Sequence, residues 1–136
     1  MTIAILIAAA LGLVDSLYLL WKRYARPHRP LVCPIGENCQ TVLASRYGSL
    51  LGFRNEFLGA GYYSALLLLL AVRGDGVLLG AIGLDPLALA TILSTIAFAV
   101  SVLLTAIQIF TLKNYCSYCL FANALNAFIF VVLVLR

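Results

Sequence analysis

Four long apolar runs alternate with polar segments along the chain. They cover residues 3–21, 57–72, 86–110 and 117–135. A continuous apolar run of about 20 residues can cross the hydrocarbon core of a bilayer as a helix, which satisfies its backbone polar groups within its own segment. The second run is shorter, so we expect its helix to take another turn from residues 54–56 or from residues 77–84. The pattern predicts an all-α integral membrane protein with a bundle of four transmembrane helices.

The composition agrees with this prediction. Of the 136 residues, 64% are hydrophobic and 10% are charged, whereas soluble domains carry about 25% charge. No repeat or separate soluble segment is visible, so we expect a single membrane domain over residues 1–136. No Lys or Arg precedes the first run, and no small-residue cleavage site follows it before Lys22, so we expect a retained transmembrane helix rather than a signal peptide. The net charge of +4 suits loops beside lipid headgroups, and no motif supports nucleic-acid binding.

The polar segment at residues 22–56 is the longest loop between the expected helices. Its first part, RPHRPLVCP, contains three prolines, which fix their own φ angles and disfavour helix, so we expect a stiff strap. Asn38 can then cap a short helix over CQTVLASRY that ends at Gly48, a residue suited to the left-handed position after a helix. The sequence therefore predicts a cysteine-bearing loop with a short cap helix between the first two transmembrane helices.

The four cysteines form two pairs, a C-x5-C pair at Cys33 and Cys39 and a C-x2-C pair at Cys116 and Cys119. With four spans, the first and third loops emerge on the same side of the membrane, so all four cysteines face one compartment. Structural disulfides, a four-thiolate zinc site and a redox relay are the three roles open to them.

The C-x2-C pair favours the redox role. Asn114 can cap the fourth helix, which puts Cys116 in its first turn, near the positive end of the helix dipole and close to Lys113; both effects stabilise the reactive thiolate. Cys119 lies one turn deeper on the same helical face. The loop pair would then receive electrons from water-soluble thiols, and the helix pair would pass them to a lipid-soluble acceptor.

The side of the membrane that carries the cysteines receives two opposed predictions. Seven of the nine Lys and Arg residues lie on the cysteine side, and the positive-inside rule would place that side in the cytoplasm. Disulfide formation instead favours an extracytoplasmic location, because the cytoplasm keeps thiols reduced.

Several stretches, spread over the whole chain, resemble one protein family. They are DSLYLLWK at the end of the first helix, CPIGENCQTVLASRYGSLLG in the loop, NEFLGAGYY entering the second helix and CSYC opening the fourth. Together with the order and spacing of the four cysteines, they resemble the vitamin K epoxide reductase family. Its members are membrane proteins of four core helices that couple disulfide formation to quinone reduction.

The resemblance implies a role for each cysteine. Cys33 would exchange with a thioredoxin-like partner, Cys39 would pass electrons to Cys116, and Cys119 would meet the quinone. Some relatives carry a fused thioredoxin-like domain, and none follows the fourth helix here, so we expect a separate partner protein.

The resemblance also implies a quinone site. Ser45 matches a hydroxyl near the active cysteines, and Asn55 matches the amide that hydrogen-bonds a quinone carbonyl in vertebrate members; Asn55 could equally cap the second helix. Asn123 stands where vertebrate members have a quinone-contacting Tyr, which favours menaquinone or ubiquinone over vitamin K epoxide.

Four further residues of the expected helices are candidates for the ring pocket or for proton transfer. Tyr62, Tyr63 and Phe121 could line the ring pocket, with ordinary packing as the alternative. Asp15 is a carboxylate within the first span, where burial is costly; it could carry a proton to the reduced quinone, or pair with a polar neighbour.

The sequence therefore predicts a multi-pass membrane thiol oxidoreductase with a dithiol donor and a quinone acceptor. Its four cysteines are extracytoplasmic by the default of the family and cytoplasmic by the Lys and Arg count. The alternatives are a vitamin K epoxide or quinone reductase proper, and a non-enzymatic membrane protein with structural disulfides or a four-cysteine zinc site.

Overall fold

The computed structural model describes residues 2–29, 31–34, 39–72, 83 and 85–136. Within these residues, four helices are long and apolar enough to cross a membrane. They are α1 (Thr2–Ala25), α3 (Asn55–Val72), α5 (Pro86–Ala106) with its π-helical extension η2 (Ile107–Leu112), and α6 (Ser117–Val134). These four helices confirm the predicted helical membrane fold. Each helix satisfies its backbone polar groups by hydrogen bonds within its own apolar segment, as a membrane span requires.

The helix ends follow from local chemistry. α1 continues past residue 21 to Ala25, since the first proline that opposes a helix is Pro27. α3 begins at Asn55, two residues before the apolar run, and so gains about half a turn at its start. Apart from residue 83, the other segment considered, 77–84, lies outside the described residues. Asp85 caps α5 as the Asp-Pro pair indicates, because its carboxylate accepts a hydrogen bond from the Leu87 N–H at 3.0 Å.

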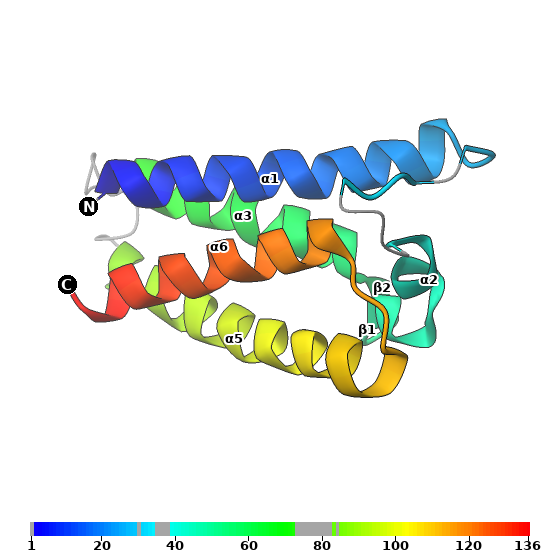
Figure 1. The fold of residues 1–136 in the computed structure, drawn as a ribbon. Coiled ribbons are helices and arrows are strands. Elements are labelled where there is room, and N and C mark those ends of the chain that lie inside the picture. The colour runs from blue at the N-terminus through cyan, green and yellow to red at the C-terminus, as the bar shows by residue number, and fades with distance from the viewer. Residues whose placement is uncertain (1, 30, 35–38, 73–82, 84) are drawn as a thin grey trace.

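The four helices form one bundle, in which α1 packs along α3 and α6, and α5 packs along α6 and α3. Figure 1 shows both chain ends at one end of the bundle and the loop with α2, β1 and β2 at the other. A core of buried side chains joins α1, α3, α5 and α6: Ile5, Ala8, Ala9, Tyr63, Leu66, Leu70, Ala90, Ile129 and Leu133. Gly12 lets α1 approach α3, because a Cβ atom at this position would overlap the ring of Tyr63.

The outer surfaces of the helices are apolar. Large side chains such as Ile3, Val14, Leu68 and Val102 are at least half exposed. A soluble protein rarely leaves so much apolar surface uncovered, and in a bilayer these side chains contact lipid. The chain is therefore a multi-pass membrane protein.

A small cap covers the cysteine end of the bundle. It consists of α2 (Cys39–Ala44), the 3-10 turn η1 (Arg46–Gly48), and a hairpin of β1 (Ser49–Leu50) and β2 (Phe53–Arg54). Ser49 pairs with Arg54 in the antiparallel register. The sequence analysis missed this hairpin, whose reversal places Leu51 and Gly52 at φ values of 53° and 83°.

Gly48 and Asn38 were expected to end and to begin the short helix of the cap. The predicted left-handed conformation at Gly48 is wrong, since among the described glycines only Gly52 and Gly83 have positive φ. A glycine is needed at position 48 for space instead, because a Cβ there would lie 2.5 Å from the carbonyl oxygen of Leu43. The predicted N-cap, Asn38, lies outside the described residues.

Candidate functional site

The four cysteines meet at the cap end of the bundle. Cys33 and Cys39 are joined by a disulfide with their Cα atoms 5.9 Å apart, and both belong to a buried cluster that also contains Cys116. Cys119 is partly buried and packs against the same cluster. Segments separated by about 80 positions in the chain thus bring both sulfur pairs into one apolar environment.

The inner pair, Cys116 and Cys119, opens α6. Cys116 itself is the N-cap, and its Sγ accepts a hydrogen bond from the Cys119 backbone N–H at 3.4 Å. The prediction that Asn114 caps this helix is wrong, because its amide donates to the carbonyl of Leu112 at 2.9 Å. Cys116 therefore precedes the first helical turn rather than lying within it, and its sulfur replaces the oxygen of an ordinary cap.

The protonation state of Cys116 depends on Cys119. A hydrogen bond from the Cys119 thiol lowers the pKa of Cys116 below its ordinary value, against the opposing effect of burial. A lower pKa favours the thiolate, which is both the reactive form and the better leaving group in disulfide exchange.

Gln108 supports the same turn from the neighbouring helix. It is 3% exposed, and its Oε1 accepts a hydrogen bond from the Cys116 backbone N–H at 3.1 Å. Gln108 lies in η2, and π-helical segments are frequent at functional sites. The sequence analysis missed this residue, since a single glutamine near the end of an apolar run carries no local signal of the contact.

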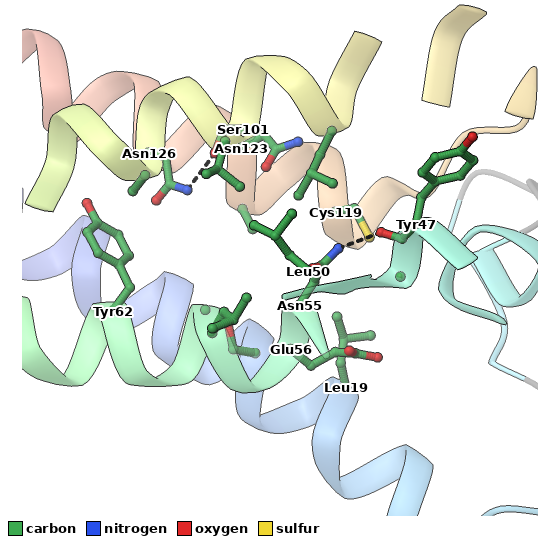
Figure 2. A pocket seen from close by; sticks show the side chains of 18 of the residues that line it. Leu19, Tyr47, Leu50, Asn55, Glu56, Tyr62, Ser101, Cys119, Asn123 and Asn126 are labelled. Carbon is green, nitrogen blue, oxygen red and sulfur yellow. Dashed lines mark hydrogen bonds between the residues drawn. The ribbon is translucent and has the colours of Figure 1, made fainter. Parts of the chain in front are cut away.

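A cavity of about 410 Å³ extends from the inner cysteine pair into the bundle. Cys119 lines it, together with four of the residues proposed for a quinone site: Ser45, Asn55, Tyr62 and Asn123. Figure 2 shows the last three around the cavity with Cys119. Phe121, also expected there, is not among the lining residues and is 47% exposed. Its place on α6 turns it away from the cavity, so it does not belong to the cavity wall.

The polar side chains around the cavity are held by hydrogen bonds. Asn55 is the first residue of α3, and its Nδ2 donates to the Tyr47 carbonyl at 2.9 Å while its Oδ1 is buried without a hydrogen-bond partner (Figure 2). The Ser45 hydroxyl donates to the Val42 carbonyl at 2.6 Å. Asn123 donates to the Thr105 hydroxyl at 2.8 Å.

Tyr62 lies deeper along α3. Its hydroxyl is 3.2 Å from that of Ser94 on α5, which fixes the direction of the ring. Tyr63, the other tyrosine considered, also lines the cavity, but its hydroxyl donates to the Ala122 carbonyl at 3.0 Å and its ring packs in the core. Tyr63 therefore has a clear packing role in addition to its place in the wall.

The arrangement of two sulfur pairs above an apolar cavity agrees with a comparison of the whole sequence. The profile of the vitamin K epoxide reductase family matches residues 3–134. The chain belongs to this family. No individual curated protein matches the chain significantly.

Membership defines the general activity. As a member of the vitamin K epoxide reductase family, the chain is a membrane oxidoreductase of the disulfide and quinone type. The cysteine cluster and the cavity are the features of its fold that suit this chemistry, because one holds exchangeable sulfurs and the other is an apolar space beside them.

Unpartnered oxygens in the cavity wall fit a ligand or water that donates hydrogen bonds. Buried oxygens of Asp15, Asn55 and Asn126 lack hydrogen-bond partners within the described structure, and all three residues line the cavity. Buried polar atoms are normally hydrogen-bonded, so orphaned atoms in an apolar cavity indicate that a ligand or water completes them. These oxygens accept hydrogen bonds, so the hydroxyl groups of a quinol, or water, meet this requirement, whereas the carbonyl oxygens of a quinone do not.

A buried ion cluster joins the cap to the helices beside the site. Glu56 is 4% exposed, and its carboxylate lies 3.0 Å from Arg23 and 3.6 Å from Arg54. Both arginines also donate to the Leu43 carbonyl, at 3.4 and 2.5 Å. We call Arg23, Arg54 and Glu56 the arginine clamp. The sequence analysis missed it, because its members come from α1, β2 and α3.

Proposed function

We propose that the protein oxidises the dithiol of a thioredoxin-like protein and reduces a membrane quinone, with Cys33, Cys39, Cys116 and Cys119 as its catalytic residues. The observation that carries the proposal is the cluster of both cysteine pairs, with Cys119 also forming part of the cavity wall. Sulfurs that belong to one cluster beside an apolar pocket are placed to act in sequence.

The cavity suits a quinone in size and chemistry. Its volume of about 410 Å³ falls within the range of roughly 300–1,000 Å³ typical of small-molecule sites. The Asn55 amide has a second N–H besides the one given to Tyr47, and we propose that it donates to a quinone oxygen. An amide donor there would stabilise negative charge as it develops on that oxygen. Menaquinone or ubiquinone is the preferred acceptor class.

The outer pair makes the first exchange. A thiolate of the partner attacks Cys33, the Cys33–Cys39 bond breaks, and a mixed disulfide forms; the second partner thiol then releases it, leaving the partner oxidised and the outer pair reduced. Cys39 next attacks Cys116 of the oxidised inner pair, and Cys119 leaves as thiolate. Attack by Cys33 on Cys39 restores the outer disulfide and releases Cys116, whose lowered pKa makes it a good leaving group.

The inner pair then returns to its disulfide. A bound quinone accepts two electrons and two protons and leaves as quinol. The bond between the Cys116 and Cys119 sulfurs forms as both S–H bonds break, and the two electrons and two protons released are those that the quinone takes up. Asp15 lines the same cavity with an unpartnered carboxyl oxygen, and we propose that it holds one of these protons in transit.

Two donors separate the roles of the cysteine pairs. Quinone reduction by the purified protein is followed with a reduced thioredoxin-like protein and, in parallel, with a small dithiol that reaches the inner pair directly. Cys119→Ala should abolish the reaction with both donors. Cys33→Ser should abolish it with the protein donor and retain most of it with the small dithiol.

The same assay can reject the relay. Undiminished turnover in Cys119→Ala would remove the inner pair from the path to the quinone. Full turnover of Cys33→Ser with the protein donor would remove the outer pair. Stoichiometric zinc in the purified, reduced protein, without quinone reduction, would support the non-enzymatic alternative.

A further inference from the structure

A second, polar cavity lies at the end of α1 outside the cysteine cluster. Its volume is about 220 Å³, and four basic side chains line it: Lys22, Arg23, Arg26 and Arg29. We call these four residues and the space between them the basic crevice. The relay described above uses none of them as a reacting group.

The positive charge of the crevice exceeds the negative charge within it. Glu56 is the acidic residue among its lining residues, and its carboxylate is already shared between Arg23 and Arg54. Among the described residues, ion pairs form only within the arginine clamp, between Glu56 and the two arginines. Lys22, Arg26 and Arg29 therefore leave the crevice with a net positive charge that suits an anion.

The basic crevice lies at the level of the membrane surface. α1 is a spanning helix that ends at Ala25, and Lys22 and Arg23 occupy its last turn. Trp21 and Tyr24, in the same turns, are 48% and 63% exposed, and such side chains gather at the level of the lipid headgroups. The Arg26 guanidinium lies 5.0 Å from the centre of the Trp21 ring, which holds this arginine at the same level.

We propose that the basic crevice binds the phosphate of an anionic phospholipid headgroup. Guanidinium groups offer paired N–H donors that match phosphate oxygens, and basic residues at the membrane surface attract anionic lipids. The volume is below the range of about 300–1,000 Å³ usual for drug-sized ligands, so it suits a headgroup whose acyl chains stay in the bilayer.

A bound headgroup would also brace the active-site loop. Arg23 belongs to α1, whereas Arg29 belongs to the strap that leads to Cys33, and Gln40, which follows Cys39, also lines the crevice. A phosphate contacting both arginines would join the strap to the helix beside the outer disulfide. The inference does not depend on the proposed function, since binding can be measured without turnover.

Lipid binding is tested with the full chain in vesicles and detergent. Protein from vesicles containing equal amounts of phosphatidylglycerol and phosphatidylcholine is examined by native mass spectrometry for retained lipid. Wild type should retain phosphatidylglycerol preferentially. The double variant R26Q/R29Q should weaken this preference by about thirtyfold, because each of the two basic residues adds to the attraction for an anionic surface.

A matched variant removes the same charge elsewhere. Arg46 and Arg136 do not line the crevice, so R46Q/R136Q should bind phosphatidylglycerol as wild type does. Thermal unfolding in phosphatidylcholine alone should be alike for all three proteins, and added phosphatidylglycerol should stabilise wild type and R46Q/R136Q but not R26Q/R29Q.

Four results would overturn the proposal. Equal loss in R46Q/R136Q would show a general effect of charge. Equal retention of both lipids by wild type would show that the crevice has no headgroup preference. Stabilisation of wild type by inorganic phosphate to the same extent as by phosphatidylglycerol would identify a free-phosphate site. Unchanged lipid retention in R26Q/R29Q, with a raised KM for a thioredoxin-like protein, would identify a docking surface for that protein.

Discussion

Replacing Glu56 by Gln tests whether the arginine clamp holds the cap over the cavity. The substitution preserves the shape of the side chain and removes its charge. In the native protein this carboxylate lies 3.0 Å from Arg23 and 3.6 Å from Arg54. Because both arginines also bind the Leu43 carbonyl, loss of the charge should loosen α1, α2 and β2 together.

The expected cost follows from the geometry. A hydrogen bond to a charged group contributes roughly 1.5–3 kcal/mol, and a neutral one about 0.5–1.5 kcal/mol. The Glu56 side chain is 2% exposed, but those of Arg23 and Arg54 are 28% and 32% exposed, so water screens part of the attraction. We expect Glu56→Gln to lower the free energy of unfolding by about 2 kcal/mol, which is about a 30-fold change in the unfolding equilibrium.

The measurement is equilibrium unfolding in mixed detergent micelles, followed by the fluorescence of Trp21, the one tryptophan of the chain. A double-mutant cycle with Arg23→Gln isolates the interaction between the two side chains and should give a coupling of about 1–2 kcal/mol. Arg46→Gln, an exposed arginine that stacks on Tyr47, should change stability by less than about 0.5 kcal/mol. Additive effects in the cycle, within about 0.5 kcal/mol, would refute a coupled clamp.

Three further predictions concern the core and the inner cysteine pair. Gly12→Ala should lower the free energy of unfolding by about 1–3 kcal/mol, because the added methyl group forces the facing tyrosine ring to move. In the same assay Gly61→Ala, whose methyl group would meet no atom within 4 Å, should be neutral or mildly stabilising. Equal losses in the two variants would contradict the close packing. Gln108→Leu should leave the buried N–H of Cys116 without its acceptor and cost about 1–3 kcal/mol, with slower quinone reduction; unaltered unfolding and turnover would show that the contact is dispensable. The rate of alkylation of reduced Cys116 by iodoacetamide should rise with pH, with a midpoint below that of an ordinary cysteine, because the Cys119 thiol lowers the pKa of Cys116. Cys119→Ala should move this midpoint upward, and a midpoint that stays in place would disprove this cause.

Features that depend on one segment of the chain could be predicted from the sequence, whereas features that depend on contacts between segments could not. The membrane spans could be predicted because the bilayer acts on each segment separately: a long apolar run must close its own hydrogen bonds wherever it lies. The common side of Cys33, Cys39, Cys116 and Cys119 follows from the same count of spans. The Asp85 cap was equally predictable, since it acts on a backbone N–H two residues away.

Local signals failed where two nearby residues competed for one role or where the packing of a helix decided the outcome. Asn114 has the chemistry of an N-cap, but its amide bonds back to Leu112, and the Cys116 sulfur takes the capping position. Phe121 was a candidate for the ring pocket as an aromatic side chain of the fourth helix, with ordinary packing as the alternative. The rotation of α6 within the bundle turned it outward instead.

From the sequence alone came the membrane class, the four spans, the shared side of the cysteines and, through its motifs, the family. Only the tertiary structure placed both sulfur pairs in one cluster, opened a cavity beside Cys119, and brought Gln108 and the arginine clamp to the site. The physical reason is that spans arise from each segment's own contact with lipid, whereas a reaction site requires side chains from several helices to converge, and that convergence depends on how the helices pack.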